Sequence, residues 1–446
     1  MSSKEQPRIP QLSGRNPWFE LSARKNEHYA ALEALKESYD YVVIGAGFTG
    51  LSAARRLIEN EPGARVAVFE ALAVGQFSSG RNAGILCPEQ LTGVLIGRSN
   101  FTADDQKWLL SLNSFALERI KGIVEGLPDQ GGLGEEGLYR AVREARNSKI
   151  LDTLQSRYAQ AGIRVERLKG SALEQKLGTA FYRDALFVPH SYSCNPAHLV
   201  RSVAACLPPE VQLFENTPVL RVSDGTPALV TLRSGQVIRA RKVLFTVSAF
   251  LKEFGVAPAA RLSAIHSYAT VTRPLKPEEA PQLYDAKPWA VTAVHPCGAT
   301  VRLLPDKRLF LRTVIDFARH QNVRPERLYR AQQAIRRALK RRFPELMDIE
   351  SEFNYGGLVS FTANARPVFA QVGQSSYAAA TCDGSGVLRG TFLGAYLADL
   401  AQGRGSRELE YLEHSSTPAY LPPEPWRSLG AAAFLRYRTI QAGSES

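Results

Sequence analysis

The chain has 446 residues, of which 44% are hydrophobic and 22% are charged, and its formal net charge is +12. No apolar run reaches the ~20 residues that a membrane-spanning helix needs, and residues 1–15 lack the apolar core of a signal peptide, so we expect a cytoplasmic protein. The five cysteines are scattered without C-x-x-C spacing, which predicts reduced thiols rather than a disulfide framework or a metal site.

The positive charge is mostly arginine, and it is densest between Arg336 and Arg342. That segment lies in an expected helix over residues 324–343, whose apolar residues recur at helical spacing. The pattern is typical of a solvated basic face opposite a buried stripe, and a phosphate-binding surface is the alternative.

At the N-terminus, residues 1–16 show no periodicity and are predicted to form a mobile arm. An apolar β-branched strand over 40–44 then leads into G-x-G-x-x-G at 45–50, a helix over 51–60 and a strand over 65–69. The first glycine permits a tight turn, the second lets the backbone approach a pyrophosphate, and the third lets the helix pack on the strand. Glu70 follows Gly50 by 20 residues, where an acidic side chain accepts hydrogen bonds from ribose. The unit predicts a bound dinucleotide, with a plain tight turn as the alternative.

Residues 75–84 are small or polar over a stretch too long for a simple turn. Such a run suits a backbone that lies flat against a planar ligand, with N–H and hydroxyl donors aimed at it. A flexible loop is the alternative.

The rest of the chain alternates between predicted strands and helices. We expect helices over 104–126 and 143–161, and another that starts at Asn195-Pro196, with Asn as N-cap. Strands are expected at 186–188, 211–215, 219–222, 228–232, 237–240, 242–246, 263–272, 290–294, 300–304, 308–314 and 377–381. Residues 382–386 form a second glycine turn that opens an apolar helix running to residue 401.

Together these motifs resemble the FAD-dependent D-amino acid oxidase superfamily, with its glycine and sarcosine oxidases, and within it the γ-glutamylputrescine oxidase-like branch. The resemblance covers nearly the whole chain, and its sharpest sign is Ser-Gly-Arg-Asn-Ala-Gly at 79–84. It implies an α/β fold in which a Rossmann-type FAD-binding domain is interleaved with an antiparallel-sheet substrate domain. The implied boundaries are an N-terminal arm (1–35), FAD-domain segments (36–95, 185–258 and 355–405), substrate-domain segments (96–184 and 259–354) and a C-terminal tail (406–446).

The resemblance also implies where FAD would lie: Glu70 on the adenosine ribose, the Val219 backbone near adenine, residues 78–84 against the isoalloxazine, and residues 384–387 at its pyrimidine end. The expected cofactor residues are Gly45, Gly47, Phe48, Thr49, Gly50, Glu70, Ser78, Ser79, Arg81, Asn82, Ala83, Gly84, Val219, Thr246, Gly384, Ser385, Gly386 and Val387. Some family members attach FAD through a Cys or a His, but the matching regions here carry Gly357 and Asn82, so we expect non-covalent FAD. Cys382, beside the second glycine turn, is expected to be a small buried residue.

The implied reaction oxidises an amine to an imine by hydride transfer to flavin N5, with O₂ as acceptor and hydrogen peroxide as product. Two alternatives stay open: a dehydrogenase that passes electrons to a quinone or carrier protein, and a flavin protein acting on tRNA.

For the substrate, Arg302, Arg312 and Arg366 lie on or next to strands, and each can bind an anionic tail through its planar fork; structural ion pairs are the alternative. His266 and Tyr268 on a substrate-domain strand can exchange hydrogen bonds with the amine, or can be packed strand residues. We therefore take His266, Tyr268 and Arg366 as catalytic candidates, and Arg302 and Arg312 as substrate-binding candidates.

Overall fold

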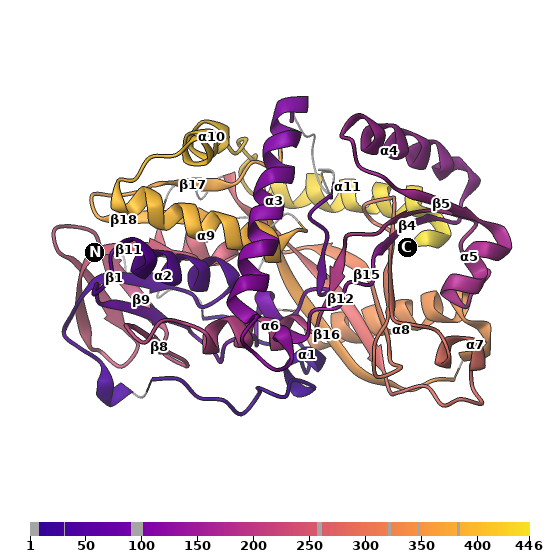
Figure 1. Ribbon diagram of the computed structural model, residues 1–446, viewed down its shortest axis with the longest axis horizontal. Coiled ribbons are helices and arrows are strands. Elements are labelled where there is room, and N and C mark those ends of the chain that lie inside the picture. The colour runs from indigo at the N-terminus through magenta and orange to yellow at the C-terminus, as the bar shows by residue number, and fades with distance from the viewer. Residues whose placement is uncertain are drawn as a thin grey trace.

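The computed structural model describes residues 9–30, 32–90, 101–256, 261–319, 323–346, 348–380 and 384–446. Within these residues the chain builds two eight-stranded sheets and one two-stranded sheet. Figure 1 shows the sheet of the glycine motif on one side of the molecule and the other large sheet on the opposite side, with helix α3 (Ala103–Val124) between them. The expected α/β class is confirmed.

The first sheet has the order β17-β18-β11-β1-β2-β8, and β9 and β10 extend it beside β11. Its strands are β1 (Ser38–Ile44), β2 (Val66–Phe69), β8 (Val211–Phe214), β9 (Val219–Ser223), β10 (Ala228–Leu232), β11 (Val237–Phe245), β17 (Val368–Gln371) and β18 (Ser376–Ala380). The five strands from β18 to β8 run parallel, and β1 and β2 are buried, as their apolar runs predict.

Helices α2 (Phe48–Asn60), α6 (Pro196–Ala205) and α9 (Gly386–Gln402) share one apolar core with this sheet and α3. Helix α6 starts as predicted, because the Asn195 side chain accepts from the backbone N–H groups of Ala197 and His198. The C-terminal segment beyond residue 405 is also helical: α10 (Arg407–Ser415) joins the same core, whereas α11 (Trp426–Ala442) packs against the second sheet.

The second sheet has the order β16-β12-β15-β14-β13-β4-β6-β5. Its strands are β4 (Leu138–Val142), β5 (Glu166–Lys169), β6 (Asp184–Val188), β12 (Ser263–Thr272), β13 (Trp289–Ala293), β14 (Thr300–Leu303), β15 (Leu309–Phe317) and β16 (Ser351–Phe361). All pairs are antiparallel except β13 with β4. Strands β6 and β16 thus pair into this sheet, although residues 185–188 and 355–361 were expected in the FAD domain.

Helix α8 (Pro325–Arg342) covers one face of the second sheet through Ala331, Ile335 and Ala338. Four of its clustered basic residues are exposed, which confirms the solvated basic face. Arg342 differs: it is 1% exposed and donates to the carbonyls of Ala338 and Glu445.

The remaining α-helices and strands are α1 (Pro17–Glu20), β3 (Ile85–Leu86), α4 (Ser148–Gln160), α5 (Gly170–Leu177), β7 (Tyr192–Ser193) and α7 (Pro281–Tyr284).

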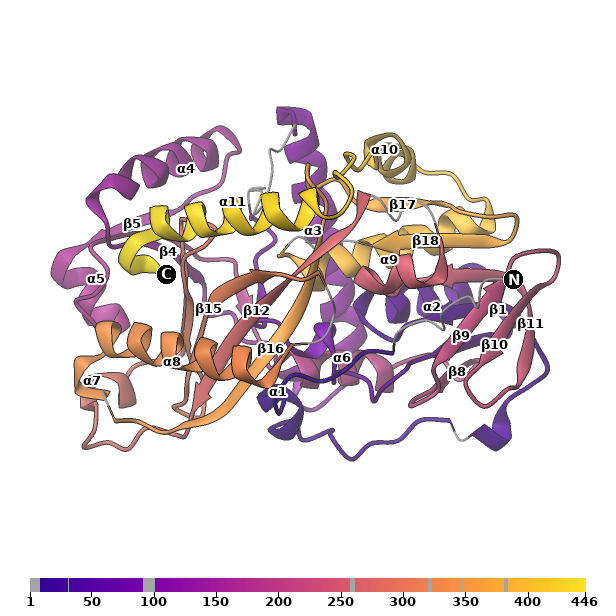
Figure 2. The same ribbon diagram turned by 180° about the vertical axis from the view of Figure 1, so that it is seen from behind.

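Residues 9–16 lie across the junction of the two sheets and lead into α1 (Figure 2). Ser13 forms a β-bridge with Gly356, and Asn16 is 5% exposed, so the prediction of a mobile arm is wrong for this described part.

The four described cysteines are free thiols, whereas Cys382 lies outside the described residues. No helix in the described part of the chain is long and apolar enough to cross a membrane.

Helices α2 and α9 approach each other closely because α9 presents glycines at the contact. A Cβ on Gly394 would lie 2.0 Å from the carbonyl oxygen of Thr49, and one on Gly390 would lie 2.9 Å from the Thr49 hydroxyl. Only glycine therefore allows this separation.

Gly394→Ala should destabilise the fold by about 1–3 kcal/mol, because the added methyl group would meet backbone. The matched control is Gly122→Ala in α3, where a Cβ meets nothing within 4 Å and removal of a helical glycine should stabilise by up to ~1 kcal/mol. Urea unfolding followed by circular dichroism measures both. Equal stability of the two variants would contradict the contact.

Candidate active site

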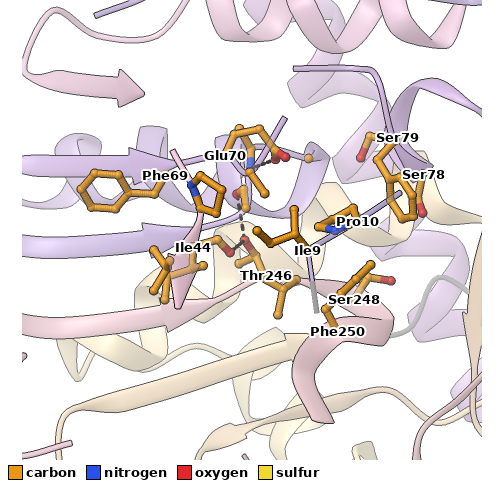
Figure 3. A pocket seen from close by; sticks show the side chains of 18 of the residues that line it. Ile9, Pro10, Ile44, Phe69, Glu70, Ser78, Ser79, Thr246, Ser248 and Phe250 are labelled. Atoms are coloured by element: carbon orange, nitrogen blue, oxygen red, sulfur yellow. Dashed lines mark hydrogen bonds between the residues drawn. The ribbon is translucent and has the colours of Figure 1, made fainter. Parts of the chain in front are cut away.

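A cavity lies at the carboxyl ends of β1, β2 and β11, with an empty volume of about 920 Å³ when its part open to solvent is counted. It is lined by the glycine turn, Glu70, Ser78, Ser79, Val219, Thr246 and Leu358, and by Ile9 and Pro10 from the N-terminal segment (Figure 3). Seven of the predicted cofactor residues, from five separate segments, thus line one cavity: Gly45, Gly47, Glu70, Ser78, Ser79, Val219 and Thr246. The predicted residues at 48–50, 81–84 and 384–387 are not among its lining residues. Ligands of open α/β sheets bind at this end of the strands.

The glycine turn has the geometry that its motif predicts. Gly45 adopts a φ of +101°, and a Cβ on Gly50 would lie 1.8 Å from the Gly45 carbonyl oxygen. Thr246 stabilises the turn, since its hydroxyl donates to the carbonyls of Ile44 and Gly45 at 2.8 and 3.0 Å. Helix α2 begins directly after Gly47 and has no side-chain cap, so its first N–H groups are available to a pyrophosphate.

Glu70 lies beside this turn. Its carboxylate accepts from the backbone N–H groups of Ala46 at 2.8 Å and Leu72 at 3.1 Å. Burial raises the pKa of Glu70, and the backbone donors oppose that shift. Each carboxylate oxygen can accept a further hydrogen bond, so ribose hydroxyls can be held in the same position.

The 78–84 run is ordered by its own side chains. The Ser78 hydroxyl donates to the Leu358 carbonyl at 2.9 Å, and the Asn82 amide donates to the Ser79 carbonyl at 2.7 Å while its oxygen accepts from the Gly84 N–H at 2.8 Å. These hydrogen bonds favour a loop held in one conformation over the flexible loop that was the alternative. The structure disfavours Arg81 as a cofactor ligand, because its guanidinium already donates to four backbone carbonyls.

The second glycine turn presents another open helix N-terminus. Gly384 has a φ of +87°, and a Cβ there would meet nothing within 4 Å. Ser385 precedes α9, and its side chain does not cap the N–H groups at the start of this helix. Thr381, Cys382 and Asp383 lie outside the described residues. The Glu70 carboxylate, a glycine turn and two helix N-termini are features that fit a flavin dinucleotide.

Arg302 and Arg312 lie on the face of the second sheet opposite α8. Arg302 is 1% exposed, and its Nη1 donates to the carbonyls of Ala83 at 2.7 Å and Cys194 at 2.8 Å, so it supports the loop predicted to contact the flavin. Arg312 donates to the Thr300 hydroxyl at 2.6 Å and the Gly298 carbonyl at 3.3 Å, and burial lowers its pKa to about 10. Among the described residues, neither arginine forms an ion pair with a carboxylate.

Sequence reasoning missed Arg140 on β4. In register, Arg140 pairs with Thr292, Thr292 with Thr300, and Thr300 with Arg312, which makes one row across four strands. Among the residues that the structure describes, the buried Nε of Arg140 and the buried hydroxyl of Thr292 have no hydrogen-bond partner. The alternation of Leu-Tyr-Arg-Ala-Val at 138–142 was the available signal, but it was hidden between a glycine-rich turn and a helix.

Arg366 is already paired. Its guanidinium binds both carboxylate oxygens of Asp105 at 2.8 Å, and Tyr411 donates to the same carboxylate at 3.0 Å. Burial raises the pKa of Asp105, but the bonds from Arg366 and Thr102 outweigh it and hold that pKa well below its usual range. This ion pair favours a structural role for Arg366 and disfavours the predicted catalytic one.

His266 and Tyr268 lie on the α8 side of the sheet, because Ala269 pairs with Arg312 and side chains alternate along β12. Tyr268 is 1% exposed and packs with α8, whose Arg327 lies 5.7 Å from its ring centre. His266 shares this face, with its ring centre 6.4 Å from that of Tyr268. The structure does not bring these two residues together with Arg302 and Arg312, which disfavours their catalytic role.

Comparisons with known proteins agree with this geometry. The family model described as FAD dependent oxidoreductase matches residues 40–400. The γ-glutamylputrescine oxidoreductase of Escherichia coli (strain K12) is 24% identical over 426 residues, which cover 94% of this chain and 96% of that protein. A probable oxidoreductase OrdL of Rhizobium meliloti (strain 1021) is 24% identical, with 94% and 95% coverage.

Among solved structures, glycine oxidase from Geobacillus kaustophilus superposes with a TM-score of 0.71 at 16% identity, covering 86% of this chain and 99% of that one. L-proline dehydrogenase from P. horikoshii superposes with a TM-score of 0.66 at 14% identity, with 85% and 97% coverage. At such identities the likeness shows a shared fold.

Glu70→Ala should weaken FAD binding by about 10- to 100-fold, because charge-assisted hydrogen bonds to ribose contribute about 1.5–3 kcal/mol. Titration of the apoprotein with FAD, followed by flavin fluorescence, measures the dissociation constant. At saturating FAD the turnover number should match the wild type. Normal FAD affinity combined with slow turnover would place Glu70 elsewhere in the site.

Proposed function

The chain belongs to the FAD dependent oxidoreductase family, and on that premise we propose that it oxidises a primary or secondary amine with a polar or anionic tail to an imine, with O₂ as acceptor. The observation that carries this proposal is the arginine-bearing sheet face beside the 78–84 loop. Arg302 contacts the loop, and Arg140 and Arg312 lie further along the face with no carboxylate partner among the described residues. The names of the relatives, an amine oxidoreductase and a glycine oxidase, point to the same bond type.

Bound FAD supplies the hydride acceptor, flavin N5, for the carbon next to nitrogen. The chain supplies position and charge. The N-terminus of α9 carries about +0.5 charge, which suits the negative charge that develops at the flavin pyrimidine end during reduction. The second sheet covers the site and excludes water, and its arginines orient an anionic tail. Since only the free amine has a lone pair to assist hydride departure, we expect the rate to rise with pH as the substrate ammonium loses its proton.

A dehydrogenase of the same fold is the second candidate, because the L-proline dehydrogenase superposes nearly as well as the glycine oxidase. An anaerobic screen of amines and amino acids, with flavin bleaching as the readout, identifies the substrate. Stoichiometric peroxide after admission of air supports the oxidase, whereas slow reoxidation by O₂ and fast reoxidation by a quinone supports the dehydrogenase. Absence of bleaching by every amine tested would refute amine oxidation.

Arg312→Lys and Arg140→Lys should each raise KM for a substrate with an anionic tail by about tenfold or more, because lysine keeps the charge and loses the planar fork. A tail-less amine should show an unchanged KM. The control is Arg167→Lys on edge strand β5, where the arginine pairs with Asp184. Equal kinetics of all variants on every substrate would leave an uncharged or cationic amine as the better hypothesis.

Acid precipitation of the purified yellow protein should release all of its FAD into the supernatant. Asn82, at one position of covalent attachment in relatives, uses its amide in the loop, and Gly357, at the other, has no side chain to react. Absorbance of the supernatant and pellet measures the partition. Flavin that stays with the pellet would establish a covalent link.

A further inference from the structure

The N-terminal segment enters the cofactor cavity. Figure 3 shows that Ile9 and Pro10 line this cavity together with Glu70, Thr246 and Ser78. Both residues lie outside residues 40–400, which the family model matches, so this wall of the cavity is an addition to the matched core. We call residues 9–16 the N-terminal strap.

Gly14 fits the strap closely against β16. It adopts a φ of +74°, and a Cβ there would lie 2.1 Å from the Asn354 carbonyl oxygen and 3.0 Å from the Tyr355 Cα. The neighbouring Ser13 carbonyl accepts from the Gly356 N–H at 2.9 Å. This contact requires a left-handed backbone conformation and leaves no room for a side chain. Glycine at this position therefore allows the strap to dock on β16.

Arg81 ties the strap to both halves of the site. Its guanidinium donates to the carbonyls of Ser13 and Gly14 in the strap at 2.9 Å each, to Gln76 in the cofactor loop at 2.8 Å, and to Gly356 in the second sheet at 3.0 Å. Burial lowers its pKa to about 10. Since an isolated buried charge is costly, these four carbonyls account for its presence here.

Asn16 fastens the far end of the strap. Its amide donates to the carbonyls of Gly75 and Gly80 at 3.0 Å each, and its oxygen accepts from the Trp18 N–H at 3.2 Å. The Trp18 indole then donates to the Tyr355 hydroxyl at 2.8 Å. The strap is therefore bonded to the start and the middle of the loop that is predicted to lie against the flavin.

We propose that the N-terminal strap closes the FAD site and sets the rate at which FAD leaves. A dinucleotide held between the glycine turn and the 78–84 loop lies beside Ile9 and Pro10, so its departure requires the strap to detach from β16 and Arg81. Because coupling between two binding events is reciprocal, bound FAD must also hold the strap in place. This inference depends on the cofactor and is independent of the substrate.

Two variants test the proposal. One lacks residues 2–12 and so keeps the anchors from Ser13 onward while removing the cavity wall. The other is Gly14→Val, which blocks docking on β16; its matched control is Gly162→Val, with a φ of +72° and nothing within 4 Å of a Cβ. FAD release is followed by flavin fluorescence after dilution of the holoprotein. Both strap variants should lose FAD at least about tenfold faster than the wild type, and Gly162→Val should not.

The wild-type protein provides a readout that needs no variant. Arg15 is exposed, with 69% of its side chain accessible, so trypsin can cleave after it when the strap detaches. Cleavage, measured by mass spectrometry, should be slower in holoprotein than in apoprotein. Unchanged FAD release in the deletion variant, or equal cleavage of the two forms, would overturn the proposal. Tighter FAD binding after deletion would also overturn it, because the segment would then compete with the cofactor. If either variant fails to fold, the wild-type cleavage experiment decides.

Discussion

The contact between α2 and α9 is the constraint on which the cofactor site depends. Gly390 and Gly394 let α9 lie against the Thr49 backbone, and no other residue fits at that distance. Each helix begins without a side-chain cap, α2 at the glycine turn and α9 after Ser385. The close packing therefore holds the first N–H groups and the positive dipole ends of both helices near each other. A flavin dinucleotide carries negative charge at its pyrophosphate and, when reduced, at its pyrimidine end, so it can complement both.

The loop at 75–84 connects the halves of the molecule, and arginines hold it by its backbone. Arg302 reaches it from the second sheet through Ala83, and Arg81 reaches outward from it to the strap and to Gly356. Both guanidinium groups donate to carbonyl oxygens rather than to a carboxylate, although among the described residues the buried Nε of Arg302 has no partner. Such a network orders the loop without adding negative charge next to the cofactor, which a buried Asp or Glu would do.

The sequence could predict features whose partners are local. The turn at 45–50, the position of Glu70 beside that turn and the Asn195 cap depend on residues within about 25 positions, and the structure has all three. The expectations that the structure overturns or disfavours involve distant partners. The strap docks on Arg81 and Asn354, Arg366 pairs with Asp105 across 261 positions, and the face occupied by His266 and Tyr268 follows from strand pairing. A single sequence shows alternation along a strand but not which face meets the cofactor.

The partners of each arginine near the site distinguish the structural arginines from those that can bind a ligand. Arg366 has Asp105 as a counterion, and Arg81 and Arg302 have several carbonyls each. Arg312 has one hydroxyl and one long carbonyl contact, and within the described residues the Nε of Arg140, like that of Arg302, has no partner. Arg140 and Arg312 are half-buried. Removing a guanidinium from water costs free energy unless it is paired, so part of that cost falls at these two positions. An anionic group between β4 and β15 would offset it, which is why an anionic substrate tail explains the row better than a cationic one.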